Sequence, residues 1–121
     1  MLTELGKELR KLRIDNDERM VEMAEKLERS PAFISSVETG KKSPPSGFEE
    51  LVIKAYGLAF DAAAKIRQAA DLSRKAFVLE PSNALGRDTA GLMARRMNTL
   101  SDADLEEIRQ ILKRGVKENG K

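Results

Sequence analysis

The fold is decided by a stretch in the first third of the chain, which reads Met23-Ala24-Glu25-Lys26-Leu27-Glu28-Arg29-Ser30-Pro31-Ala32-Phe33-Ile34-Ser35-Ser36-Val37-Glu38-Thr39-Gly40. Ser30 can cap the free amides of a helix, and Pro31 suits the first helical position. Gly40 suits the left-handed residue that ends a helix. Because the residues before Ser30 also have helical apolar spacing, the stretch predicts two short helices joined by a tight turn. Ala24 provides the small side chain that such a crossing needs.

Helices are predicted on both sides of this stretch. Towards the N-terminus, Thr3 caps a helix with an apolar face that ends at the polar residues 15–17. The first helix of the decisive pair is expected over 19–28. Towards the C-terminus, Ser46 and Glu49 fit a capping box that opens a helix ending at Gly57.

The middle of the chain predicts one more helix and then a hinge. An alanine-rich helix is expected over 60–75, with a narrow packing face at Ile66, Ala69, Ala70 and Ser73. Residues 77–81 break the helical pattern, and their bulky apolar side chains before a proline predict an extended segment or a short strand. We interpret this segment as the hinge between two halves.

Two further helices are predicted after the hinge. The first is expected to begin late, near Arg87, because Gly86 weakens its first turn. Ser101 and Asp104 cap the second, which is expected to end at Gly115. Residues 116–121 are expected to fray.

Composition favours an all-α protein. The 121 residues are 40% hydrophobic and 35% charged but only 4% aromatic, which suits amphipathic helices. There is no cysteine and no histidine, so disulfides, thiolates, imidazole bases and the usual zinc ligands are excluded. No metal and no cofactor is expected. The net charge of +2 indicates nothing about nucleic acid, so a DNA-binding function must rest on local geometry.

The sequence does not predict contact with a membrane. Its N-terminus lacks the pattern of a signal peptide, and no apolar run approaches the roughly 20 residues of a membrane span. We therefore expect a cytoplasmic protein.

Four segments resemble the XRE family of helix-turn-helix regulators, which includes lambda-like phage repressors and many antitoxins. They are Leu12-Arg13-Ile14, Met23 to Leu27, Ser30 to Lys41, and Ala55-Tyr56-Gly57-Leu58. The resemblance implies a five-helix lambda-repressor-like DNA-binding domain over 1–75 that binds as a dimer. A C-terminal extension of two further helices would occupy 76–121, where residues 94–102 look like the extensions of some phage and mobile-element regulators.

The resemblance also implies a structural clasp. Arg13 and Glu38 match a pair that joins the first and third helices of the family through a charged hydrogen bond. A planar guanidinium suits a carboxylate in that role. The alternative is that both are solvated surface charges.

The implied DNA-reading positions lie at the start of the recognition helix, which would enter the major groove. They are Ser30, Pro31, Ala32, Phe33, Ser35 and Ser36. None can make the bidentate contacts through which arginine reads guanine or glutamine reads adenine. Specificity is therefore expected to depend on apolar contacts, backbone positioning and DNA shape.

Three cations match positions that contact phosphates, namely Arg19, Lys41 and Lys42. The alternative for the two lysines is an ordinary solvated loop. Met20 replaces a glutamine common in the family, and we interpret it as a core or interface residue. Phe33 is either a groove contact or a partial core residue wrapped by Arg29.

The sequence suggests two functions and argues against a third. The first is a sequence-specific repressor that binds an inverted repeat as a homodimer and associates with the nucleoid when bound to DNA. The second is an antitoxin or adaptor whose extension binds a protein partner. An enzyme is not expected, because the acidic run Asp102, Asp104, Glu106 and Glu107 is better explained as the negative first turns of a helix. The apolar residues after Lys75 suit either dimerisation or packing within one subunit.

Overall fold

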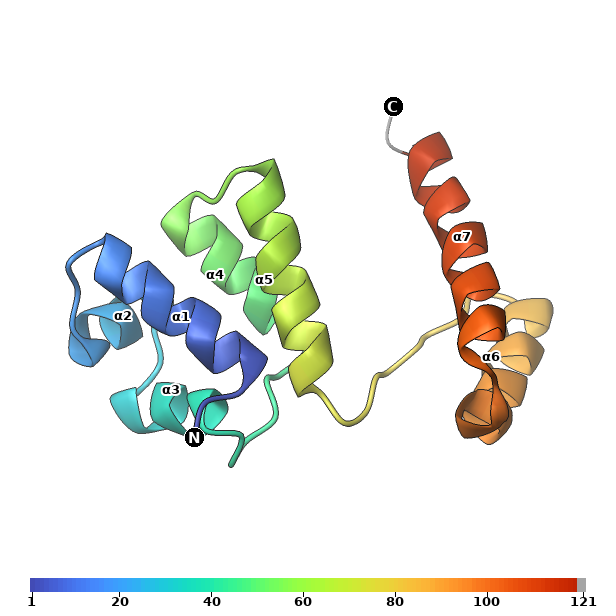
Figure 1. Ribbon diagram of the computed structural model, residues 1–121, viewed down its shortest axis with the longest axis horizontal. Coiled ribbons are helices and arrows are strands. Elements are labelled where there is room, and N and C mark those ends of the chain that lie inside the picture. The colour runs from blue at the N-terminus through green and yellow to red at the C-terminus, as the bar shows by residue number, and fades with distance from the viewer. Residues whose placement is uncertain (120–121) are drawn as a thin grey trace. The chain divides into compact units, whose positions relative to one another are not determined.

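The computed structural model describes residues 1–119, and it is all-helical (Figure 1). This confirms the predicted all-α class. The chain divides into two compact units, one from Met1 to Phe77 and one from Val78 onward. The helices of the first unit are α1 (Glu4–Asp15), α2 (Met20–Leu27), α3 (Pro31–Glu38), α4 (Phe48–Tyr56) and α5 (Phe60–Ser73). The second unit contains α6 (Ala84–Arg96), the 3-10 helix η1 (Met97–Thr99) and α7 (Asp102–Asn119).

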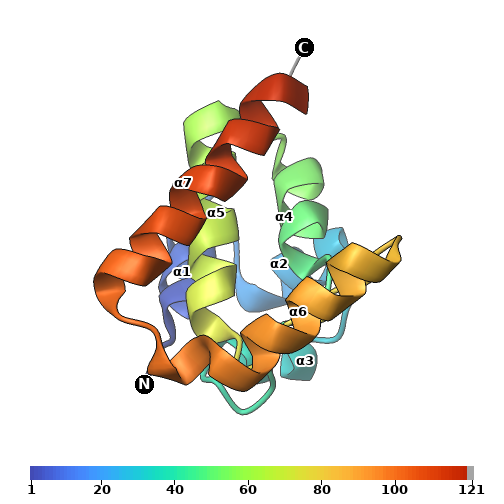
Figure 2. The ribbon, with the colours of Figure 1, turned by 90° about the vertical axis from the view of Figure 1, so that its right-hand side faces the viewer.

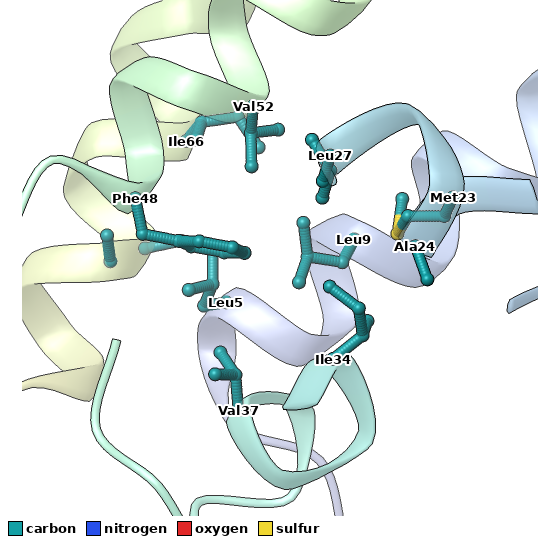
Figure 3. Close-up of a cluster of buried hydrophobic side chains, with 12 residues drawn as sticks. Leu5, Leu9, Met23, Ala24, Leu27, Ile34, Val37, Phe48, Val52 and Ile66 are labelled. Carbon is teal, nitrogen blue, oxygen red and sulfur yellow. The ribbon is translucent and has the colours of Figure 1, made fainter. Parts of the chain in front are cut away.

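The first unit encloses one hydrophobic core to which all five of its helices contribute. Leu5 and Leu9 of α1 are fully buried in it, and Ala24 is 1% exposed at the contact between α2 and α3. Figure 3 shows the side chains of the other helices converging on Leu9. Complete burial of each large side chain contributes about 1.5–3 kcal/mol, so this core is what holds α2 and α3 in place. Its members are Leu5, Leu9, Met23, Ala24, Leu27, Ile34, Val37, Phe48, Val52, Ile66, Ala69 and Ala70.

Most predicted helix ends of the first unit are confirmed. The Thr3 hydroxyl accepts the Gly6 N–H, and the Ser30 hydroxyl accepts the Phe33 N–H. Gly40 follows α3 with a φ of 82°, which lies in the left-handed region that favours glycine.

The capping box predicted from Ser46 and Glu49 is wrong. Helix α4 begins at Phe48, after Gly47 in the left-handed conformation, and no side chain caps it. Glu49 instead accepts hydrogen bonds from Arg74. An ion pair with a distant arginine has therefore replaced the local capping contact.

Helix α5 ends at Ser73, two residues before the predicted end, because Arg74 turns back towards the loop before α4. Its guanidinium donates to the carbonyls of Pro44 at 3.1 Å and Pro45 at 2.7 Å, and to the carboxylate of Glu49. The Arg74 side chain is only 8% exposed. It fixes the loop that follows α3.

In the second unit, two helices leave the turn at η1 in diverging directions (Figure 2). The predicted late start of α6 near Arg87 is wrong, because the Asn83 side chain accepts the Gly86 N–H at 2.7 Å and caps the helix at Ala84. The Ser101 cap of α7 is confirmed, since its hydroxyl accepts the Asp104 N–H.

Helix α7 continues past Gly115 to Asn119, so its predicted end is wrong, and the fraying of 116–121 stays a prediction. Residues 120–121 lie outside the described part of the chain. No strand forms at 77–81; the segment is non-helical, as predicted, but has no second strand to pair with in the described chain. None of the described helices is both long enough and apolar enough to cross a membrane.

A polar cluster joins the segment before α2 and the last turn of α2 to the end of α4. The Tyr56 hydroxyl donates to Glu18 Oε1 at 2.6 Å, and Lys26 Nζ lies 2.6 Å from Glu18 Oε2. The hydrogen bond from Lys26, and then that from Tyr56, lowers the pKa of Glu18. Burial, followed by the hydrogen bond to Glu18, raises the pKa of Tyr56.

The first unit is expected to lose stability in acid through Glu18 and Glu49. Burial is the largest single influence on Glu49 and would raise its pKa, but the hydrogen bond and charge of Arg74 and a backbone hydrogen bond together outweigh burial. Both carboxyls therefore have folded-state pKa values below the ordinary 4.5. Their stabilisation is complete above the ordinary pKa and is lost as the pH falls through the lower folded-state pKa. Urea unfolding across this range should show a falling free energy of unfolding, with a smaller fall in Glu18→Gln and Glu49→Gln. Exposed Glu25→Gln controls for the loss of one charge, and a fall unchanged in both test variants would contradict the assignment.

Candidate nucleic-acid interface

Helices α2 and α3 are joined by a short turn whose backbone is hydrogen-bonded. Glu28 adopts the left-handed conformation with a φ of 56°, and the Arg29 N–H donates to the Ala24 carbonyl at 2.9 Å. Ser30 then caps α3. The direction of α3 relative to α2 is therefore set by local backbone contacts as well as by the core.

The outer face of α3 is polar or small, and it carries no charge. Pro31, Ala32 and Ser35 are exposed, and Ser36 is half-buried. Ser30, at the cap, is also exposed. The only ionisable residue of the helix, Glu38, is buried on the opposite side. A polyanion approaching this face would meet no uncompensated carboxylate of α3.

Arg13 and Glu38 form a buried ion pair that joins α1 to α3. Arg13 Nη1 donates to Glu38 Oε2, and Nη2 donates to Oε1 at 3.3 Å. The side chains are only 10% and 5% exposed, so they are not solvated surface charges. Arg13 Nη1 also lies 3.4 Å from the sulfur of Met23, which brings α2 into the same contact.

The backbone of α1 and the end of α3 approach each other closely at Gly6. The Thr3 N–H and the Thr3 hydroxyl both donate to the Glu38 carbonyl, at 2.9 and 3.2 Å. A Cβ atom at Gly6 would lie 2.4 Å from that same oxygen. Sequence reasoning did not identify Gly6, although a glycine inside a strongly helical stretch is a signal of close approach.

Two of the three predicted phosphate-binding cations lie in the loop that follows α3, and the third precedes α2. Lys41 and Lys42 are exposed, and the Lys42 N–H donates to the Ser36 carbonyl at 3.0 Å, so their loop folds back on α3. Arg19 is exposed before α2, and its guanidinium is 3.6 Å from the Glu22 carboxylate. All three side chains are accessible to phosphates.

Phe33 lies between the core and the surface. Its ring meets that of Phe48 edge-on, with centroids 5.8 Å apart. Arg29 and Lys42 lie over it at 5.9 and 5.6 Å, so the structure places Phe33 as a partial core residue wrapped by two cations. Met20 is likewise half-buried and packs against the core.

The described residues contain no group of three or more acidic side chains arranged to hold a metal ion. No family model, no curated protein and no solved structure matches this chain.

Proposed function

We propose that the chain is a sequence-specific DNA-binding transcriptional regulator of the XRE type, with α2 and α3 as its helix-turn-helix in a five-helix lambda-repressor-like domain and α6 and α7 as its extension. One observation carries the proposal: a buried ion pair anchors α3 from behind, while its outer face is uncharged and lies next to Lys41 and Lys42. A helix that enters a DNA groove must be held rigidly on its inner side, and its outer side must be free of negative charge and open to the DNA.

In this proposal α3 enters the major groove with its N-terminal residues on the base edges. Ala32 contacts thymine methyl groups, and Ser35 and Ser36 donate to bases or phosphates. Arg19, Lys41 and Lys42 bind the phosphate backbone and set the register. Because no side chain on α3 reads a base with two hydrogen bonds, DNA shape supplies much of the specificity.

The regulator is proposed to bind an inverted repeat as a homodimer in the cytoplasm, on the nucleoid. Half-sites about one helical turn apart would match the two-fold symmetry of such a dimer. Repression follows if the operator overlaps a promoter.

Removal of the two loop lysines is expected to weaken binding to all DNA sequences alike. In Lys41→Ala/Lys42→Ala the slope of log affinity against log salt should fall by about 2, because two phosphate contacts are lost. Lys54→Ala, at an exposed position in the last turn of α4, is the control and should bind like the wild type. Titration of labelled mixed-sequence duplex at several salt concentrations measures both the affinity and its dependence on salt. Absence of wild-type binding even at low salt would contradict the proposal.

A second candidate is an antitoxin or adaptor, which is favoured by exposed apolar side chains in the second unit such as Leu85 and Leu112. A groove on a protein partner would cover them. Binding to mixed-sequence DNA distinguishes this candidate from the regulator, because an adaptor that acts through its extension alone has no need of the α3 face.

A further inference from the structure

The second unit carries apolar side chains that it does not bury. No residue of α6 is buried, and Leu92, Ile111 and Leu112 are 50%, 56% and 62% exposed. A unit of two helices is too small to enclose a core by itself. Because removal of apolar surface from water contributes about 25 cal/mol per Å², these side chains favour contact with another surface.

Along one edge of α7 acidic residues precede basic residues, so an antiparallel copy of the helix would present opposite charges to it. Asp102, Glu106, Arg109 and Lys113 are separated by four, three and four residues, which places them along one edge of the helix. Two acids lie towards the N-terminus and two bases towards the C-terminus. All four are exposed, and the pair of Glu106 and Arg109 within one chain is long, at 3.8 Å.

An apolar stripe lies beside this charged edge. Leu105, Ile108 and Leu112 follow one another at spacings of three and four residues. Leu105 and Ile108 are half-buried, and Leu112 is exposed. An apolar stripe bordered by charges is typical of helices that pair side by side, where the charges set the orientation of the partner.

We propose that α7 pairs antiparallel with the α7 of a second copy, about a two-fold axis near Ile108. Asp102 would face the second copy's Lys113, and Glu106 would face the second copy's Arg109. Both contacts are compatible with one register, because positions 102 and 113 and positions 106 and 109 are centred on the same point, between residues 107 and 108. The two-fold axis repeats each contact. A parallel pair would set acid against acid and base against base, and an unrelated protein has no reason to match this order.

The inference rests on the homodimer of the proposed function, and its test contains no DNA, so that either proposal can fail alone. Sedimentation of the full-length wild type should show a dimer. Glu106→Lys and Arg109→Glu should each weaken dimerisation about tenfold, because each places two like-charged pairs in the interface. An equimolar mixture of the two variants should restore the dimer, since every contact is again between opposite charges.

Matched controls lie off the charged edge of the same helix. Glu107→Lys and Arg114→Glu make the same changes of charge and should leave the dissociation constant unchanged. A wild type that remains monomeric would overturn the proposal, and the apolar face would then belong to another surface of the same chain or to a different protein. A dimer that is insensitive to both test variants, or a mixture that does not recover it, would overturn it equally.

Discussion

Glu38→Met is expected to destabilise the first unit by about 3–5 kcal/mol, because it leaves the Arg13 guanidinium buried without its carboxylate. A small domain has a total stability of about 5–15 kcal/mol, so this loss would unfold a substantial fraction of molecules at moderate temperature. Arg13→Met should have an effect of the same size, with Glu38 then buried alone. Urea unfolding of the full chain, followed by helical circular dichroism, measures both.

The double variant Arg13→Met/Glu38→Met separates two effects on the free energy of unfolding. One is the contribution of the ion pair itself, and the other is the cost of burying one charge without its partner. Replacement of a buried ion pair by apolar side chains of similar volume is often close to neutral. We therefore expect the double variant to be more stable than either single variant. Additive losses in the double variant would show that the two residues act independently, which the bidentate geometry does not allow.

Helix ends in the first unit were predictable where the signal lies within a few residues of the structure that it determines. Thr3 and Ser30 cap amides three residues away, and Gly40 adopts its left-handed conformation one residue after the C-cap of α3. Apolar spacing also identified the packing face of α5, where Ile66, Ala69 and Ala70 are buried. The all-α class followed from the composition, which is rich in charged residues and poor in aromatic ones.

Contacts across long sequence separations could not be predicted in this way. Arg74 reaches the carbonyls of Pro44 and Pro45, about 30 residues earlier, and in doing so ends α5 and removes Glu49 from the predicted capping box. Nothing local to residues 73–75 indicates that interaction. The pairing of Arg13 with Glu38 was expected only through family resemblance, since apolar spacing does not indicate which charges are buried.

In the candidate site, too, local features could be predicted from the sequence and long-range contacts could not. The family resemblance implied reading positions at Pro31, Ala32 and Ser36, flanked by Phe33 and Ser35. Pro31, Ala32 and Ser35 are exposed, and Ser36 is half-buried. The sequence left Phe33 open between groove and core, because a single aromatic residue at an edge position suits either. The contact with Phe48, fifteen residues later, is tertiary and decides where the ring packs.

Gly6→Ala is expected to destabilise the first unit by about 3 kcal/mol, although alanine is the better helix former. The new Cβ would lie 2.4 Å from the Glu38 carbonyl oxygen and 3.0 Å from two further backbone atoms of Glu38, so a side-chain movement cannot relieve the clash. Helices α1 and α3 must separate, and the hydrogen bonds from Thr3 to Glu38 are then lost.

Gly91→Ala in α6 is the matched control, because a Cβ there meets nothing closer than 3.6 Å. It should stabilise its helix by about 0.5–1 kcal/mol through the ordinary preference for alanine. Because Gly91 lies in the second unit, the unfolding temperature of the first unit should fall in Gly6→Ala and stay unchanged in Gly91→Ala. If Gly6→Ala raised the unfolding temperature of the first unit, the close approach of α1 to the end of α3 would be wrong. The contacts that hold α3 in place would then be the Arg13–Glu38 pair and the core alone.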